Sequence, residues 1–182
     1  MTIASVTPKT SDYLFSPALL KEFKGQVPDG IRIRPLKTSD YHDGFLEVLA
    51  QLTSVGQISE DDFLSRFETM RTKPQSYYVV VLENLNTEKV VGAATLVVEW
   101  KFIHEAGCRG RVEDVVVDSS MRGKKLGVLL NEILVDLAKK LEVYKLSLEC
   151  KDSLITFYEQ FGYKKDAGNN FLVQRFDGDL KA

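Results

Sequence analysis

The spacing of apolar residues in the first half of the chain begins as the alternation of a strand and then widens to that of helices. The run Ile31-Arg32-Ile33-Arg34 alternates apolar and charged side chains, which predicts a half-buried first strand. The run Thr38-Ser39-Asp40 is a cap signal for a helix over about residues 41–53, whose apolar stripe is Phe45, Val48, Leu49 and Leu52. Ser59 and Asp62 resemble the capping box of a second helix, which carries Phe63, Phe67 and Met70.

From residue 77 the spacing becomes that of strands. Residues 77–82 are a β-rich run, Asn84-Leu85-Asn86 is a hairpin turn signal, and residues 90–102 form a long second arm. A third strand follows at Val112, Val115, Val116 and Val117. Such a run of β-branched residues is typical of a strand that is buried on both faces.

The last third of the chain alternates between helical and strand patterns. Residues 124–141 place seven apolar residues on one broad helical face, and residues 144–150 alternate apolar and polar residues as a strand does. Residues 155–161 predict a short helix closed by Gly162, and residues 171–176 predict a final strand.

These elements predict an α+β fold, a sheet with helices on both faces, in the order β-α-α-β-β-β-α-β-α-β. Residues 1–30 form a lead-in that is irregular apart from one short helix starting at Ser16-Pro17, and residues 31–182 form a single domain. A chain of 182 residues is long enough for one substantial core and too short for two.

Composition excludes several classes of function. Hydrophobic residues make up 44% of the chain and charged residues 27%, which is usual for a soluble globular protein. The net charge of −2 argues against a nucleic-acid binder that works through bulk positive charge. The start of the chain lacks the pattern of a secretory signal, and its two cysteines show no metal-ligand spacing, so we expect a cytoplasmic protein without a metal or transmembrane segment.

A candidate anion site follows the valine-rich strand. Asp118-Ser119-Ser120 ends the strand, and Arg122-Gly123-Lys124-Lys125-Leu126-Gly127 leads into the helix over residues 124–141. Free N–H groups at a helix N-terminus attract anions, and the lysines add positive charge, so we expect a phosphate-bearing ligand here.

This order of elements and this loop resemble the GNAT superfamily of acetyl-CoA-dependent N-acetyltransferases, whose loop pattern is Arg/Gln-x-x-Gly-x-Gly/Ala. Arg122 and Gly127 match the ends of the pattern, whereas Lys125 stands where the first glycine is usual. The resemblance implies the GNAT fold, with a mixed and mainly antiparallel sheet. It also implies that coenzyme A is held by Val115, Arg122, Gly123, Lys124, Lys125, Leu126, Gly127 and Val128.

Within that superfamily, residues 31–177 resemble the eukaryotic glucosamine-6-phosphate N-acetyltransferases. The matching blocks include Leu52-Thr53 with Val55-Gly56, Lys101-Phe102-Ile103-His104, Gly110-Arg111-Val112-Glu113-Asp114-Val115, Leu148-Glu149-Cys150, Phe157-Tyr158 and Gln174-Arg175-Phe176. The resemblance implies acetyl transfer from acetyl-CoA to the amine of D-glucosamine 6-phosphate by direct attack in a ternary complex. It further implies a homodimer with shared sites and a role in UDP-N-acetylglucosamine biosynthesis.

The same resemblance implies roles for individual residues. Val115 offers its backbone N–H to the oxyanion, Glu149 lies beside the attacking amine, and Tyr158 donates a proton to the departing sulfur. Sugar-phosphate binding is assigned to Thr53, Lys101, Phe102, Ile103, His104, Glu113, Asp114, Glu149 and Arg175. Leu154 departs from the family pattern, because an asparagine there often contacts the pantetheine arm.

Purely structural explanations of several of these residues stay open beside these roles. Strand alternation places Glu113 on the opposite face from Val112 and Asp114, so the two carboxylates are not expected to act as one cluster. Arg32, Arg34 and Arg111 are expected to be solvated strand charges, and Cys150 a buried strand cysteine that could alternatively form a mixed disulfide with coenzyme A. The alternative functions are a GNAT enzyme with another amine acceptor and a non-catalytic coenzyme-A-binding module.

Overall fold

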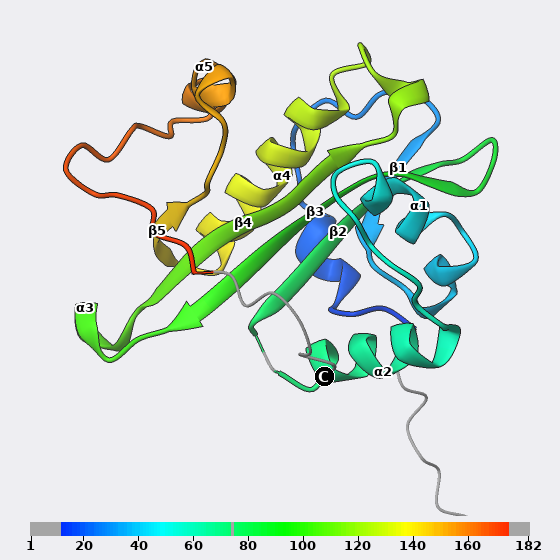
Figure 1. Ribbon diagram of the computed structural model, residues 1–182, viewed down its shortest axis with the longest axis horizontal. Coiled ribbons are helices and arrows are strands. Elements are labelled where there is room, and N and C mark those ends of the chain that lie inside the picture. The colour runs from blue at the N-terminus through cyan, green and yellow to red at the C-terminus, as the bar shows by residue number, and fades with distance from the viewer. Residues whose placement is uncertain (1–11, 74, 175–182) are drawn as a thin grey trace, which may run out of the picture. The chain divides into compact units, whose positions relative to one another are not determined.

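The computed structural model describes residues 12–73 and 75–174, which form two units, one ending at Leu148 and the other beginning at Glu149. The first unit is built on a five-stranded sheet in the order β1-β2-β3-β4-β5 (Figure 1). Its first four strands pair antiparallel and the last pair is parallel, so the sheet is mixed and mainly antiparallel as predicted. The strands are β1 Ile31–Pro35, β2 Tyr77–Asn84, β3 Lys89–Trp100, β4 Cys108–Val117 and β5 Val143–Ser147.

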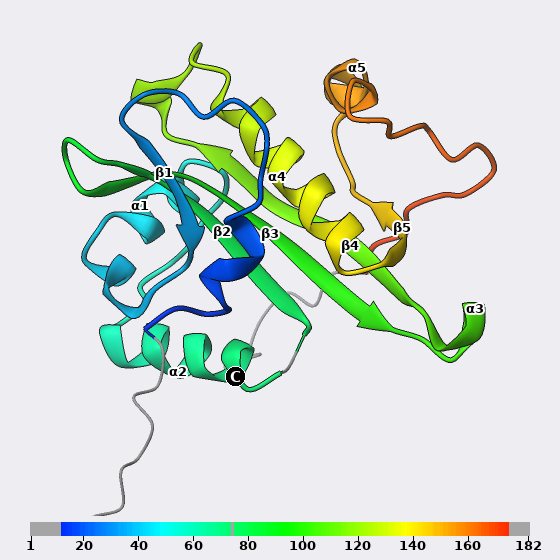
Figure 2. The same cartoon turned by 180° about the vertical axis from the view of Figure 1, so that it is seen from behind.

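Helices cover both faces of this sheet, and each face has its own hydrophobic core (Figures 1 and 2). On one face lie α4, Leu126–Lys140, and the 3₁₀ helix η1, Pro17–Leu20. The other face is covered by α1, Phe45–Ala50, and α2, Glu60–Arg71, through Phe45, Val48, Phe63 and Phe67. The long apolar face predicted for α4 is confirmed, because Leu126, Leu129, Leu130, Ile133, Leu134 and Leu137 are all buried.

The helix predicted over residues 41–53 is shorter than expected. A 3₁₀ helix, η2 Thr38–Tyr41, comes first, and α1 begins only after Gly44, whose φ of 91° interrupts the helical path. Leu52 then falls beyond the end of α1 and is 47% exposed, so its predicted place in the apolar stripe is wrong. The capping box at Ser59 and Asp62 is confirmed as the start of α2.

Arg34 is buried rather than solvated, which corrects the prediction for it. Its guanidinium donates to both carboxylate oxygens of Asp40, at 2.7 and 2.8 Å, and to Glu83 at 2.8 Å. All three side chains are at most 4% exposed, so the charges compensate one another inside the fold. Arg32 reaches the same Glu83 oxygen from a half-exposed position, and Arg111 pairs with Glu113, so neither is simply solvated.

The second unit contains the 3₁₀ helix η4, Asp152–Leu154, and α5, Ile155–Glu159. Gly162 follows α5 with a φ of 91°, as a helix-terminating glycine does. The strand predicted over residues 144–150 ends at Ser147, so Glu149 and Cys150 lie outside it. Residues 171–174 form no strand, and the rest of the predicted last strand lies outside the described residues.

Candidate active site

A β-bulge interrupts β4 at the point where the sequence places its acidic pair. Ala93 pairs with Val116 and Thr95 with Glu113, so Asp114 and Val115 together stand opposite the single residue Ala94. Such a bulge locally breaks the ladder of the strand and turns a side chain in a new direction. The bulge thus includes Val115, the residue whose backbone N–H was expected to bind the oxyanion.

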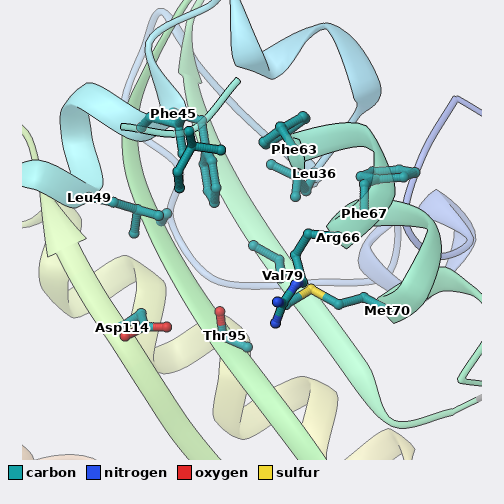
Figure 3. Close-up of a pocket in the computed structure, with 13 residues that line it drawn as sticks. Leu36, Phe45, Leu49, Phe63, Arg66, Phe67, Met70, Val79, Thr95 and Asp114 are labelled. Carbon is teal, nitrogen blue, oxygen red and sulfur yellow. The ribbon is translucent and has the colours of Figure 1, made fainter. Parts of the chain in front are cut away.

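The bulge brings Glu113 and Asp114 to the same face, which corrects the prediction that alternation separates them. Val112 and Val115, three residues apart, both pack on the α4 side, whereas in a regular strand they would face opposite sides. Glu113 pairs with Thr95 and so shares its face, and Thr95 lines a pocket on the α1–α2 side together with Asp114 (Figure 3). The two carboxylates can therefore act as a cluster.

Asp114 holds a backbone conformation that is uncommon for a residue with a side chain. Its φ is 53°, in the left-handed region, where aspartate is tolerated better than most residues but still strained. The residue as a whole is exposed, yet its carboxyl faces an apolar pocket. This partial burial raises the pKa of Asp114, and the nearby negative charge of Glu113 raises it further. A carboxylate with a raised pKa is a better proton acceptor than an ordinary aspartate.

The loop before α4 has the geometry of an anion site. It follows the 3₁₀ helix η3, Ser119–Met121, and ends at Lys125, the N-cap of α4, with a φ of 57°. The side chains of Arg122, Lys124 and Lys125 are exposed, and Gly123 has a φ of 80° with open space where a Cβ would project. The first N–H groups of this 15-residue helix thus point into a loop bearing three cations, which suits a pyrophosphate.

Gln51 joins this region to the end of α1, a link that the sequence analysis missed. Its amide nitrogen donates to Asp118 at 2.8 Å, and its amide oxygen accepts from the backbone N–H of Ser119 at 2.8 Å. Asp118 in turn accepts from the Ser120 hydroxyl and N–H, and these bonds together with that from Gln51 lower the pKa of Asp118. Thr53, a predicted sugar contact, lies two residues beyond Gln51 and is exposed.

The run from Lys101 to His104 lies at the tip of the β3–β4 hairpin, not at the bulge. Trp100 pairs with Cys108, five residues along β4 from Glu113, so the rise of a strand puts the tip about 16 Å from the bulge. Lys101 pairs with Glu99 at 2.5 Å, and the His104 ring lies 4.2 Å from that of Tyr144. Phe102 and Ile103 are 102% and 62% exposed. Within one protomer, the tip and the carboxylate pair therefore lie at separate places along β4.

The remaining predicted residues belong to the second unit or lie outside the described residues. Glu149 and Cys150 are exposed, so the expectation of a buried Cys150 is wrong, and Cys108 is the buried cysteine of the two. Tyr158 packs edge-to-face on Phe157 at 5.0 Å, and burial, followed by the charge of Cys150, raises the pKa of its phenol. Arg175 lies outside the described residues.

Two further polar side chains on the pocket were missed by the sequence analysis, Thr95 and Arg66 (Figure 3). Thr95 gave no signal, since it lies within an ordinary strand run. Arg66 gave one, because it sits three residues after Phe63 and four before Met70, a lone cation on the apolar side of α2. In the described ranges, no helix is long and apolar enough to cross a membrane, and no cluster of three or more His, Cys, Asp or Glu residues could hold a metal ion.

Comparison with known proteins agrees with this geometry. The model of the acetyltransferase (GNAT) family matches residues 42–163. A protein of Drosophila melanogaster named as a probable glucosamine 6-phosphate N-acetyltransferase is 45% identical over 170 residues, which cover 91% of this chain and 77% of that protein. The glucosamine 6-phosphate N-acetyltransferase of Candida albicans is 40% identical over 150 residues, or 82% of this chain and 99% of its own.

Solved structures show the same fold. The crystal structure of glucosamine-6-phosphate N-acetyltransferase from Arabidopsis thaliana superposes with a TM-score of 0.75 at 34% identity, covering 81% of this chain and 99% of that one. A more distant acetyltransferase from Agrobacterium tumefaciens, at 22% identity and a TM-score of 0.70, shares the fold.

Proposed function

The chain belongs to the acetyltransferase (GNAT) family, and on this premise we propose that it transfers the acetyl group of acetyl-CoA to the amine of glucosamine 6-phosphate. The observation that carries the proposal is the bulge in β4, which turns Glu113 and Asp114 to one face while β4 runs on into the anion loop before α4. One strand thus leads from a cluster suited to an amino sugar to a loop suited to a pyrophosphate.

The coenzyme fits the loop at the start of α4. We assign its pyrophosphate to the backbone N–H groups of residues 123–128, with Arg122, Lys124 and Lys125 supplying positive charge. The left-handed conformation of Lys125 supports this assignment, because it gives a lysine the backbone geometry that a glycine has in the family pattern and directs the side chain away from the bound phosphates. When bound, acetyl-CoA supplies the thioester to be attacked.

The acceptor amine is assigned to the carboxylates of Glu113 and Asp114. Arg111 offsets the charge of Glu113, so it is chiefly the charge of Asp114 that attracts an ammonium group. The raised pKa of Asp114 suits it to take the proton that the amine must lose before attack. Asp114 is therefore a second candidate for the base, in addition to Glu149. Attack then forms the C–N bond, and the Val115 N–H is the proposed donor to the developing oxyanion.

Tyr158 is the proposed acid of the reaction. As the C–S bond breaks, its phenol gives a proton to the thiolate, which otherwise leaves as an anion. Its raised pKa supports this role, because the phenol stays protonated at neutral pH. In this proposal the acetyl group passes directly from the coenzyme sulfur to the amine nitrogen. No side chain of the protein carries it in between.

The separation of the hairpin tip from the bulge supports a homodimer with shared sites. Lys101 and His104 lie about 16 Å along the sheet from Glu113, farther than one sugar phosphate spans, so in this proposal they serve the site of a second copy. The exposed apolar side chains Trp100, Phe102 and Ile103 at the same tip suit burial in a subunit interface. Arg175 joins them as the proposed bidentate phosphate ligand.

The surroundings of the reaction follow from the same proposal. Both cysteines of the chain, Cys108 and Cys150, are free thiols, which supports a reducing, cytoplasmic compartment. N-acetylglucosamine 6-phosphate, the product, would enter UDP-N-acetylglucosamine synthesis.

The decisive experiment measures free thiol released from acetyl-CoA with glucosamine 6-phosphate, glucosamine and a set of polyamines and lysine peptides. Turnover restricted to glucosamine 6-phosphate is expected, because only that acceptor offers both an amine and a phosphate. Faster turnover of another amine would overturn the substrate assignment. Thermal stabilisation by coenzyme A without turnover of any amine would identify a non-catalytic module instead.

Subunit sharing is tested by mixing two inactive variants. Asp114→Asn disables the carboxylate cluster and Arg175→Ala the proposed phosphate ligand. If these residues reach one site from different subunits, co-refolded mixtures regain activity that neither variant has alone. A mixture as inactive as its components, with heterodimers verified by mass spectrometry, would show that each site is built within one subunit.

A further inference from the structure

The pocket beside Asp114 has a lining that the acetyl-transfer reaction does not use. It measures about 170 Å³, and ten of its thirteen lining residues are apolar. The rings of Phe45, Phe63 and Phe67 form one wall. The ring centroid of Phe63 lies 6.1 Å from that of Phe45 and 6.5 Å from that of Phe67, and Val79 and Leu49 line other parts of the pocket. An engineered apolar cavity of about 150 Å³ stays dry and binds benzene, so this volume suits one aromatic ring.

Three polar side chains lie along one side of this pocket, namely Arg66, Thr95 and Asp114, opposite the phenylalanine rings (Figure 3). Arg66 reaches the pocket from α2, Thr95 from β3 and Asp114 from the bulge of β4. Within the described part of the chain, none of the three has a hydrogen bond or ion pair, although most other arginines of the same unit are paired. An apolar pocket with a few convergent polar groups is the usual form of a small-molecule site.

Glucosamine 6-phosphate does not suit this pocket. Its ring carries hydroxyl groups all round, and enclosing them among the phenylalanine and leucine side chains would leave them without hydrogen-bond partners. The acceptor therefore belongs outside the pocket, on the solvent side of Asp114, and the apolar interior is left for a different ligand.

We propose that this pocket is a second binding site, which takes a small aromatic carboxylate. The ring occupies the space between Phe45, Phe63 and Val79, and the carboxylate lies against the Arg66 guanidinium. Charge favours an anion over a cation at that end, because Arg66 is the pocket's cation and has no carboxylate partner in the described chain. The Thr95 hydroxyl can donate to the same carboxylate.

Occupation of the pocket would reach the proposed acceptor site through Asp114. The ligand's carboxylate lies on the same side of the pocket as Asp114, so its negative charge disfavours the charged form of Asp114 and weakens the attraction of Asp114 for an ammonium group. This consequence rests on the proposed function, whereas binding itself does not. We expect the aromatic acid to raise the KM for glucosamine 6-phosphate while leaving that for acetyl-CoA unchanged.

The test uses 4-fluorobenzoate as the probe and fluorobenzene as its uncharged counterpart, both followed by ¹⁹F NMR on the full chain. Both are expected to bind, with the acid tighter. Arg66→Gln should weaken 4-fluorobenzoate about tenfold, the worth of one charge-assisted hydrogen bond, and leave fluorobenzene unchanged. Arg71→Gln is the matched control, because Arg71 lies on the same helix, outside the pocket and paired with Glu68; it should change neither probe.

Two further variants locate the site. Ala93 lines the pocket, so Ala93→Leu reduces the pocket volume and should abolish binding of both probes; Val79→Ile serves the same purpose if the larger change prevents folding. Failure of both probes to bind the wild type, equal weakening by Arg66→Gln and Arg71→Gln, or unchanged binding in a folded, filled variant would each overturn the proposal. A protein that binds the probe without acetylating glucosamine 6-phosphate would overturn the proposed function and leave this site standing.

Discussion

Arg34 allows a quantitative prediction, because two arginines contact one oxygen of Glu83 in different surroundings. Arg34 is 4% exposed and lies 2.8 Å from that oxygen, whereas Arg32 is 52% exposed and lies 2.7 Å from it. Arg34→Met would leave Asp40 and Glu83, 0% and 1% exposed, without their buried counter-charge. Breaking a buried pair in this way costs about 3–5 kcal/mol of unfolding free energy. Arg32→Met should cost about 1 kcal/mol or less, because solvent screens its charge.

The pH dependence follows from the direction of the Glu83 shift. Burial by itself would raise the pKa of Glu83, but hydrogen bonds and charge from Arg34 and Arg32 lower it overall. A lowered carboxylate pKa gives stability that is present above the unfolded pKa and lost as pH falls through the folded one. Arg34→Met should therefore unfold more easily at neutral pH and lose less further stability on acidification than the wild type.

Urea unfolding followed by far-UV circular dichroism measures these differences. Tryptophan fluorescence is a poorer probe, because the single Trp100 is 55% exposed at the hairpin tip. If Arg34→Met costs no more than Arg32→Met, burial does not determine the strength of this network, and the reasoning from exposure is refuted.

Four further predictions concern the site. Asp114→Asn should raise the unfolding free energy at neutral pH and lower acceptor turnover. The pKa of Asp114 is raised by burial and by Glu113, so its charged form destabilises the folded protein as pH rises through its titration. Urea titration at two pH values checks the first effect and steady-state kinetics the second. Lys125→Gly should stabilise the chain by about 1 kcal/mol by relieving its positive φ, whereas Lys124→Gly should destabilise it in the same urea assay. Gln51→Ala should raise the KM for acetyl-CoA roughly 2- to 10-fold by releasing Asp118 and Ser119, and an unchanged KM would remove its positioning role. Tyr158→Phe should lower kcat roughly 100-fold with little change in KM, and because the raised pKa keeps the phenol protonated, wild-type turnover should show no loss from its deprotonation between about pH 7 and 9.

Local patterns in the sequence were sufficient for much of this fold. The alternation of Ile31 to Arg34, the capping box of Ser59 and Asp62, and the leucine face of α4 depend on neighbours within a few residues, so they could be read directly. The candidate anion loop could be predicted for the same reason, as a run of cations and glycines between a strand and a helix.

Tertiary structure decided what depends on register and on distant partners. Alternation alone predicted that Glu113 and Asp114 lie on opposite faces of the sheet. Only the pairing of β4 with β3 shows the bulge that places both on one face. Arg34 was expected in water because its partners, Asp40 and Glu83, lie on other elements. The aromatic pocket with Arg66, Thr95 and Asp114 likewise exists only where α2, β3 and β4 meet, since no local spacing records which residues of separate elements face one another.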